Sequence, residues 1–138
     1  MKFGIPALTV MLRKSVFEKV GLYDENLIIE DWDMWIRIAD KGSLAFIIEK
    51  LAYYRMHDNN ISSNLQLMMQ SRFQIIEKWK AVYPEIYKKA SIYWRTEALK
   101  QFSKNSKDAF KYLNFDWEYL SDKKYRKYLI KYIFYKIF

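Results

Sequence analysis

The sequence predicts an α+β fold that is mainly α-helical, with short strands confined to the first part of the chain. A length of 138 residues, 51% of them hydrophobic, suits one core of ordinary domain size and not two. Short apolar runs of strand type occur before residue 58, and apolar residues recur with helical spacing after residue 64. We therefore expect strands and helices in residues 1–62 and a helical extension in residues 63–138.

The first part of the chain is expected to begin with a strand and two helices. Residues 5–12, IPALTVML, form an apolar run typical of a short buried strand. Ser15 and Glu18 then form an S-x-x-E capping box, and Gly21 follows where a left-handed residue would end that helix. The second helix is predicted at residues 31–40. Its apolar side chains at spacing i, i+3, i+4 and i+7 are Trp32, Trp35, Ile36 and Ala39.

Two further strands and four helices complete the expected order. The runs LAFII at residues 44–48 and LAYYRMH at residues 51–57 are rich in strand-forming residues. The boundary between the two parts is expected near Ser62, in the polar stretch DNNISSN. Four helices are predicted beyond it, at residues 65–82, 84–102, 108–113 and 122–137. Pro84 supports the first boundary, because a proline ends the preceding helix and is favoured at the start of the next.

The charges are divided unevenly along a chain whose net charge is +8. Residues 1–60 hold eight Lys or Arg against nine Asp or Glu, whereas residues 100–138 hold ten against four. Because the chain has no cysteine, disulfides, thiolate metal sites and cysteine nucleophiles are excluded. No stretch reaches the roughly 18–20 apolar residues of a membrane span, and no signal peptide is recognisable, so we expect a cytoplasmic protein.

Three carboxylates lie close together in the stretch IEDWDMW: Glu30, Asp31 and Asp33. A D-x-D pair on an extended loop can bind one divalent cation, but on a helix Asp31 and Asp33 would point about 200° apart, which excludes a two-aspartate metal site. Asp33 is instead expected to pair with Arg37 one helical turn later. Glu30 and Asp31 remain at the helix N-terminus, where Asp31 is either an N-cap or a functional carboxylate.

A second group of polar residues follows in YYRMHDNNIS. If residues 51–57 form a strand, Tyr53, Arg55 and His57 share one side of it. The Arg55 guanidinium suits phosphate oxygens, and Ser62 offers a hydroxyl. His57, which is the only histidine of the chain, can bind a divalent cation through its imidazole. The alternative is a strand end whose histidine faces the solvent.

The order and spacing of these motifs resemble a known family. Residues 9–62, with GLYDE, EDWDMWIR and YRMHDNNIS, are similar to the C-terminal half of the catalytic domain of bacterial family-2 glycosyltransferases, which have the GT-A fold. The resemblance implies a hexosyltransferase-like, inverting transfer of a sugar from a nucleotide-sugar to an acceptor hydroxyl. It further implies a place in the synthesis of cell-surface polysaccharide or glycolipid.

The resemblance also implies roles for single residues. Asp31, with Glu30 beside it, matches the catalytic base that takes the proton of the acceptor hydroxyl. Arg55 and Ser62 match positions near the donor diphosphate, and His57 matches a position near its cation. The set is completed by the acceptor-pocket residues Trp32 and Trp35 and by the supporting pair Asp33 and Arg37.

The nucleotide-binding half of such an enzyme, with its D-x-D motif, is missing from this sequence. Three glycines in 138 residues leave no phosphate-binding glycine-rich loop. We therefore expect a fragment that is inactive alone and holds no metal by itself. The complete enzyme would use Mg²⁺ or Mn²⁺, a nucleotide-sugar donor and a saccharide or lipid-linked acceptor.

A different class of function fits the charge of the chain. A sequence pI of about 9.5 and 19% aromatic residues are typical of a basic helical interaction module that binds nucleic acid or an anionic membrane surface. No named nucleic-acid-binding pattern is present, so nucleic acid is not expected. The tail at residues 123–138 carries an apolar stripe beside Lys124, Lys127 and Lys131. The stripe comprises Tyr125, Tyr128, Leu129, Tyr132 and Ile133.

This stripe has two possible uses. An amphipathic segment at the end of a helical domain is expected to pack against the preceding helices. The alternative is peripheral contact between residues 123–138 and the inner face of the cell membrane.

Overall fold

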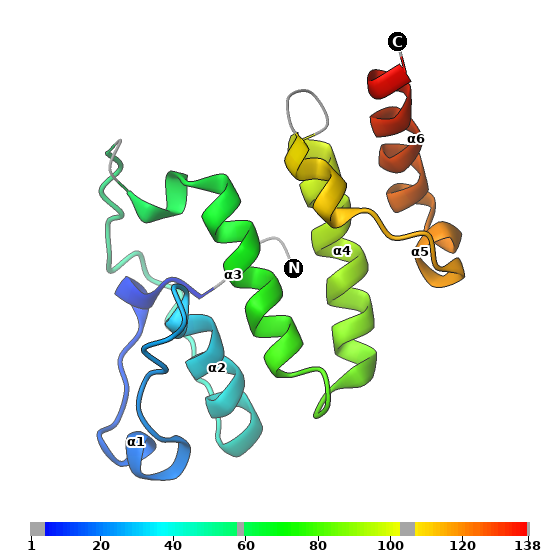
Figure 1. Cartoon of the computed structure of the whole chain (residues 1–138). Coiled ribbons are helices and arrows are strands. Elements are labelled where there is room, and N and C mark those ends of the chain that lie inside the picture. The colour runs from blue at the N-terminus through cyan, green and yellow to red at the C-terminus, as the bar shows by residue number, and fades with distance from the viewer. Residues whose placement is uncertain (1–4, 58–59, 103–106, 138) are drawn as a thin grey trace. The chain divides into compact units, whose positions relative to one another are not determined.

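The computed structural model describes residues 5–57, 60–102 and 107–137, and its regular elements are all helical (Figure 1). The α-helices are α1 (Ser15–Val20), α2 (Glu30–Lys41), α3 (Leu65–Lys78), α4 (Pro84–Phe102), α5 (Trp117–Ser121) and α6 (Lys123–Ile137). The 3₁₀ helices are η1 (Ala7–Thr9), η2 (Ile61–Ser63) and η3 (Lys107–Tyr112). The elements that lie within a few residues of a predicted helix are α1, α2, α4, η3 and α6. The helix α3 ends four residues before its predicted end, and α5 was not predicted.

The predicted α+β fold is wrong, because the described part of the chain contains no strand. Residues 5–12 form η1 within an extended stretch, where Thr9 donates its N–H to the carbonyl of Pro6 at 2.9 Å. Residues 44–48 and 51–57 are extended but unpaired. A strand is stable only when a neighbouring strand satisfies its backbone groups, and no described segment does so. The strand propensity of these segments therefore predicted the wrong fold class, because no described segment pairs with them.

The contacts divide the chain into two compact units. Unit 1 is Met1–Ser71 and unit 2 is Arg72–Phe138. The boundary between them lies inside α3, nine residues after the boundary predicted at Ser62. Unit 1 contains α1 and α2, which pack against each other, and unit 2 contains α4, α5 and α6. Each unit has its own hydrophobic cluster.

The core of unit 1 is built on one side of α2. Met34, Trp35 and Ile38 are buried there at the i, i+1 and i+4 positions of a single helix face. Apolar side chains from the first part of the chain pack against them, including Val16, Phe17 and Val20 of α1 and also Ile5, Val10, Leu12 and Trp32. The indole N–H of Trp35 donates to the carbonyl of Ile5 at 2.9 Å, which ties the first described residue to α2.

A polar clamp joins α2 to the end of α1. Arg37 Nε lies 3.0 Å from Oδ2 of Asp33, whose side chain is 0% exposed, so the predicted ion pair is present. The same guanidinium donates to the carbonyl oxygens of Val20 and Leu22. Gly21 lies between them with a φ of +79°, a left-handed conformation that favours glycine. The clamp therefore fixes the path of the chain between the two helices.

Tyrosine side chains form much of the core of unit 2. Tyr119, Tyr125 and Tyr132 are buried together with Leu99 and Leu129 where α6 packs against α4 and α5. The stripe predicted at residues 123–138 thus supplies core residues, although Ile133 is 39% exposed.

The buried hydroxyl groups in unit 2 have partners. The Tyr125 hydroxyl accepts the N–H of Asn114 at 2.7 Å and donates to the carbonyl of the same residue at 3.0 Å. The hydroxyl oxygens of Tyr119 and Ser91 lie 2.9 Å apart. Asp122 caps α6, because its Oδ1 accepts the N–H of Tyr125 at 2.7 Å. These bonds fix the position of α6 relative to the other elements of the unit.

Replacing Arg37 by methionine should strongly destabilise unit 1. The buried Asp33 carboxylate would lose its cation, and breaking a buried pair in this way costs about 3–5 kcal/mol. Urea unfolding measures the loss, and hydrogen exchange of the amides in α1 and α2 assigns it to unit 1. The matched control is Lys41→Met, which removes an exposed pair with Asp40 and should cost less than about 1 kcal/mol. Equal losses in the two variants would contradict the clamp.

Candidate functional site

Glu30 and Asp31 are the first two residues of α2, and both are partly buried. Asp31 is not the N-cap, because Ile29 holds that position, and Oδ1 of Asp31 accepts the N–H of Trp32 at 2.9 Å. Burial raises the pKa of Asp31 above its ordinary value of 3.8, and the charge of Glu30 raises it further, whereas backbone hydrogen bonds oppose the rise. A raised pKa makes a carboxylate a stronger proton acceptor.

The other predicted residues of α2 face the core of unit 1. Asp33 pairs with Arg37, so the two aspartates of the D-x-D sequence have different partners. Trp35 is 8% exposed, and Trp32 packs against the same hydrophobic cluster. The two tryptophans that were predicted at an acceptor pocket are thus part of the core cluster or packed against it.

Arg55, His57 and Ser62 lie on the exposed stretch between α2 and α3. The hydroxyl oxygens of Ser62 and Tyr54 are 2.9 Å apart. Because residues 51–57 are not a strand, the alternation that would place Arg55 and His57 on one side does not apply. Among the described residues, no three His, Asp or Glu side chains gather closely enough to hold a metal ion.

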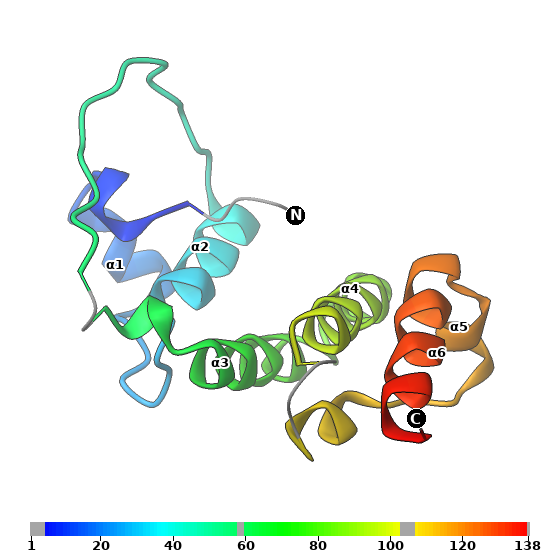
Figure 2. The ribbon, with the colours of Figure 1, turned by 90° about the horizontal axis from the view of Figure 1, so that it is seen from above.

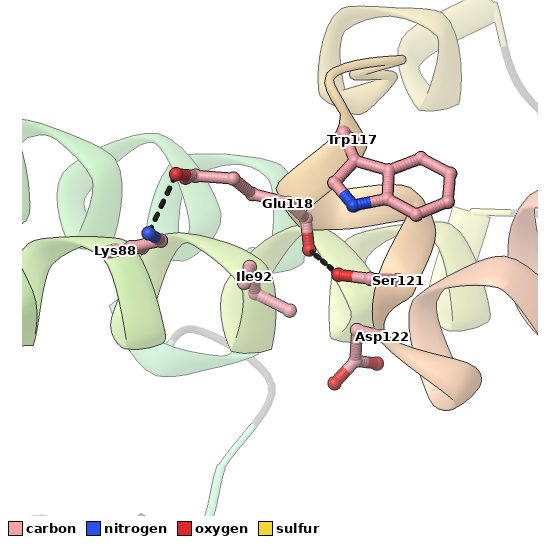
Figure 3. Close-up of a pocket in the computed structure, with 6 residues that line it drawn as sticks. All are labelled: Lys88, Ile92, Trp117, Glu118, Ser121 and Asp122. Carbon is pink, nitrogen blue, oxygen red and sulfur yellow. Dashed lines mark hydrogen bonds and ion pairs between the residues drawn. The ribbon is translucent and has the colours of Figure 1, made fainter.

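Two hollows stand out on the surface, one in each unit. The hollow in unit 1, of about 180 Å³, lies against α1 and the end of α2. The hollow in unit 2, of about 370 Å³, lies between α4 and α5 (Figure 3). On its rim Lys88 Nζ is 2.6 Å from Glu118 Oε1, and the hydroxyl of Ser121 donates to the Glu118 carbonyl at 2.9 Å. The indole of Trp117 is 80% exposed beside them.

Neither hollow is lined by Asp31, Arg55 or His57. The charges on the rim of the unit 2 hollow are already engaged, since Lys88 neutralises Glu118 and Asp122 caps α6. The geometry of the unit 2 hollow therefore gives no reason to place chemistry there.

The exposed side of α6 combines cations with apolar side chains. We call it the outer face of α6 and define it by the exposed residues Lys123, Arg126, Lys127, Ile130, Lys131, Ile133 and Phe134. Ile130 is 60% exposed and Phe134 is 59% exposed. Phe134 lies about 180° around the helix axis from the buried Tyr125. Within the described part of the chain, no carboxylate pairs with Lys123, Lys127 or Lys131.

Ile130 and Phe134 were not among the residues predicted to form the apolar stripe of this helix. Their i, i+4 spacing opposite the tyrosine stripe was a signal for a second apolar surface on the same helix. Arg126 also belongs to this face, and its Nη1 donates to the carbonyl of Leu120 at 2.8 Å.

No protein-family model, curated protein or solved structure matches the chain. The resemblance to family-2 glycosyltransferases is wrong, since half of a GT-A domain requires strands and the described residues form none. The sugar transfer, the Mg²⁺ or Mn²⁺, the nucleotide-sugar donor and the acceptor that it implied stay predictions.

The pKa of Asp31 makes stability depend on pH. Because the pKa is raised in the folded chain, the protonated carboxyl favours folding below pH 3.8, and this contribution is lost as the pH rises through the raised pKa. Asp31→Asn should therefore increase the free energy of unfolding at pH 7 and leave it nearly unchanged well below pH 3.8. Urea unfolding at the two pH values measures this difference.

An NMR titration of the Asp31 carboxyl carbon gives the pKa directly. The control is Glu30→Gln, which should move the pKa of Asp31 only part of the way back toward 3.8, because burial is the larger cause. A pKa of Asp31 at or below 3.8 in the native chain would show that burial does not act as described.

Proposed function

We propose that unit 2 is a basic helical module that adsorbs to an anionic membrane surface through the outer face of α6. The observation that carries the proposal is the exposure of Ile130 and Phe134 among lysines. The opposite side of the helix is fixed in the core by Tyr125 and Leu129, so the helix cannot turn these apolar side chains inward without breaking that core.

The charge of unit 2 supports an anionic partner. Residues 72–138 hold 16 Lys or Arg against seven Asp or Glu, a net charge of +9, whereas residues 1–71 hold eight against nine, a net charge of −1. Each Lys or Arg close to an anionic lipid surface contributes about 1 kcal/mol to binding. The lysines of the outer face that have no described acidic partner, Lys123, Lys127 and Lys131, are able to make that contribution.

The apolar part of the outer face favours lipid over nucleic acid. The aliphatic side chains of Ile130 and Ile133 find no partner on a phosphate backbone, and they offer no ring for a base to stack on. At a membrane they are buried at the boundary between headgroups and acyl chains, which is the usual place for the apolar residues of an interfacial helix. Unit 2 also exposes the rings of Phe110, Phe115 and Trp117, a type of side chain that suits this boundary.

Adsorption to the surface agrees with the composition of the helices. Among the described residues, no helix has both the length and the apolar composition that a membrane crossing requires. The leaflet we propose is the cytoplasmic one, because it carries the anionic lipids. The protein would therefore be cytoplasmic and peripheral to the inner face of the cell membrane.

Co-sedimentation with lipid vesicles tests the proposal. We expect binding to vesicles that contain an anionic lipid, weaker binding as salt is added, and none to purely zwitterionic vesicles. Reversal of two charges in Lys127→Glu/Lys131→Glu should weaken binding at least about tenfold. Ile130→Ser/Phe134→Ser, which leaves the charge unchanged, should also weaken it, because the apolar contribution is lost.

The matched control is Lys14→Glu/Lys19→Glu, which makes the same change in net charge on exposed residues of unit 1. This variant should bind nearly as well as the native chain. An equal loss in the control would mean that net charge alone, and not the outer face, drives adsorption. Binding to an oligonucleotide that is insensitive to Ile130→Ser/Phe134→Ser, with no binding to anionic vesicles at low salt, would replace membrane by nucleic acid.

A further inference from the structure

The hollow in unit 1 is lined by three cations and by no carboxylate. It lies where α1 and α2 pack against each other, and Figures 1 and 2 both show these two helices side by side. The cations are Arg13, just before α1, Lys19 in α1 and Lys41 at the end of α2. A hollow lined by charges of one sign concentrates ions of the opposite sign, so this hollow attracts anions.

Two of the three cations are available to a ligand. Lys41 Nζ lies 3.0 Å from Oδ2 of Asp40, which already balances its charge. No described carboxylate pairs with Arg13 or Lys19, and both residues are exposed. The two remaining positive charges match a ligand with two negative charges.

Hydroxyl groups complete the polar part of the lining. They belong to Ser15, the first residue of α1, and to Ser43, which follows α2. Neither hydroxyl makes a hydrogen bond to another described residue. The planar fork of an arginine suits phosphate oxygens, and hydroxyl groups donate to the oxygens that remain. A phosphate monoester has close to two negative charges at pH 7 and three strong acceptor oxygens, so it fits both the charge and the donors.

The rest of the lining is apolar and limits the size of the ligand. Val16 and Val20 of α1 and Ile38 of α2 belong to the core cluster of unit 1 or pack against it. Sites for nucleotides and drug-sized ligands have volumes of about 300–1,000 Å³. This hollow, at about 180 Å³, is smaller. It therefore suits a phosphate whose ester group is short and apolar.

We propose that the hollow between α1 and the end of α2 binds a small phosphate monoester with a short apolar group. Arg13 and Lys19 neutralise its two charges, the two serine hydroxyls donate to its oxygens, and the two valines contact its ester group. The site lies in unit 1 and does not depend on the membrane contact proposed for the outer face of α6.

The cations beside α1 are the decisive part of this site. The end of a helix is the negative end of its dipole and disfavours an anion. At the end of α2 the carbonyl of Ile38 accepts the N–H of Gly42 at 2.8 Å, and Lys41 is shared with Asp40. The affinity for a phosphate therefore comes mainly from Arg13 and Lys19.

NMR titration of the full chain with propyl phosphate tests the proposal. The amide signals of residues 13–20 and 38–43 should shift and saturate, with a dissociation constant on the order of 1 mM for a ligand of so few atoms. Glycerol phosphate has the same number of carbons but carries two hydroxyl groups. It should bind at least about threefold more weakly, because the lining that faces the ester group is apolar. No saturable shift, or shifts confined to other residues, would overturn the proposal.

Variants identify the groups that bind the phosphate. Arg13→Gln/Lys19→Gln should weaken the binding of propyl phosphate at least about tenfold, because both unpaired cations are lost. The matched control is Lys14→Gln/Lys50→Gln, which makes the same change in net charge on exposed residues of unit 1 outside the hollow. It should leave the dissociation constant nearly unchanged. Ser43→Ala, outside both helices, should weaken binding about threefold without affecting their packing. Equal affinities of the two double variants would contradict the site.

Two kinds of vesicle distinguish a soluble ester from a lipid headgroup. Phosphatidic acid is a phosphate monoester, whereas phosphatidylglycerol is a diester. We expect a soluble ester, for which Arg13→Gln/Lys19→Gln should bind both kinds of vesicle as well as the control variant does. A loss of binding that is confined to phosphatidic acid vesicles would assign the monoester to a lipid.

Discussion

The arrangement of unit 1 depends on one guanidinium group. Arg37 binds a carboxylate on its own helix and the carbonyl oxygens of Val20 and Leu22. A single side chain therefore connects α2 to the chain on both sides of Gly21. The apolar core beside it is small, with Met34, Trp35 and Ile38 as its buried members. A buried carboxylate such as Asp33 is tolerated only with a cation next to it. Because the same cation also binds the segment after α1, where Gly21 reverses the chain, this requirement holds α2 against that segment.

The sequence was sufficient for interactions within a helix and insufficient for those between segments. Asp33 and Arg37 are four residues apart, so their pairing followed from helical geometry alone. The contacts of Arg37 with Val20 and Leu22 depend on how α1 and α2 come together, and no local pattern contains that information. The same limit explains the error over strands, because a segment with high strand propensity still needs a second segment to pair with.

The same dependence on contacts between segments decided how far Asp31 and the outer face of α6 could be predicted. The position of Asp31 at the start of α2 followed from the helical spacing, whereas its partial burial depends on how the segments of unit 1 pack. On α6, however, the sequence contains two apolar sides, one through Tyr125 and Leu129 and another through Ile130 and Phe134. Which side is buried depends on the shape of α4 and α5, so the outer face became visible only in the folded unit.

The tyrosine core of unit 2 limits how this unit can change. Leucine or isoleucine cores accept many combinations of similar volume, since dispersion contacts have little direction. The hydroxyl groups of Tyr119 and Tyr125 instead need partners at defined distances, which Ser91 and Asn114 supply from other elements. Ser91 and Tyr119 bond through their side chains, so they are expected to vary together or not at all. Asn114 supplies backbone groups, so a substitution at Tyr125, and not at Asn114, removes that pair of hydrogen bonds.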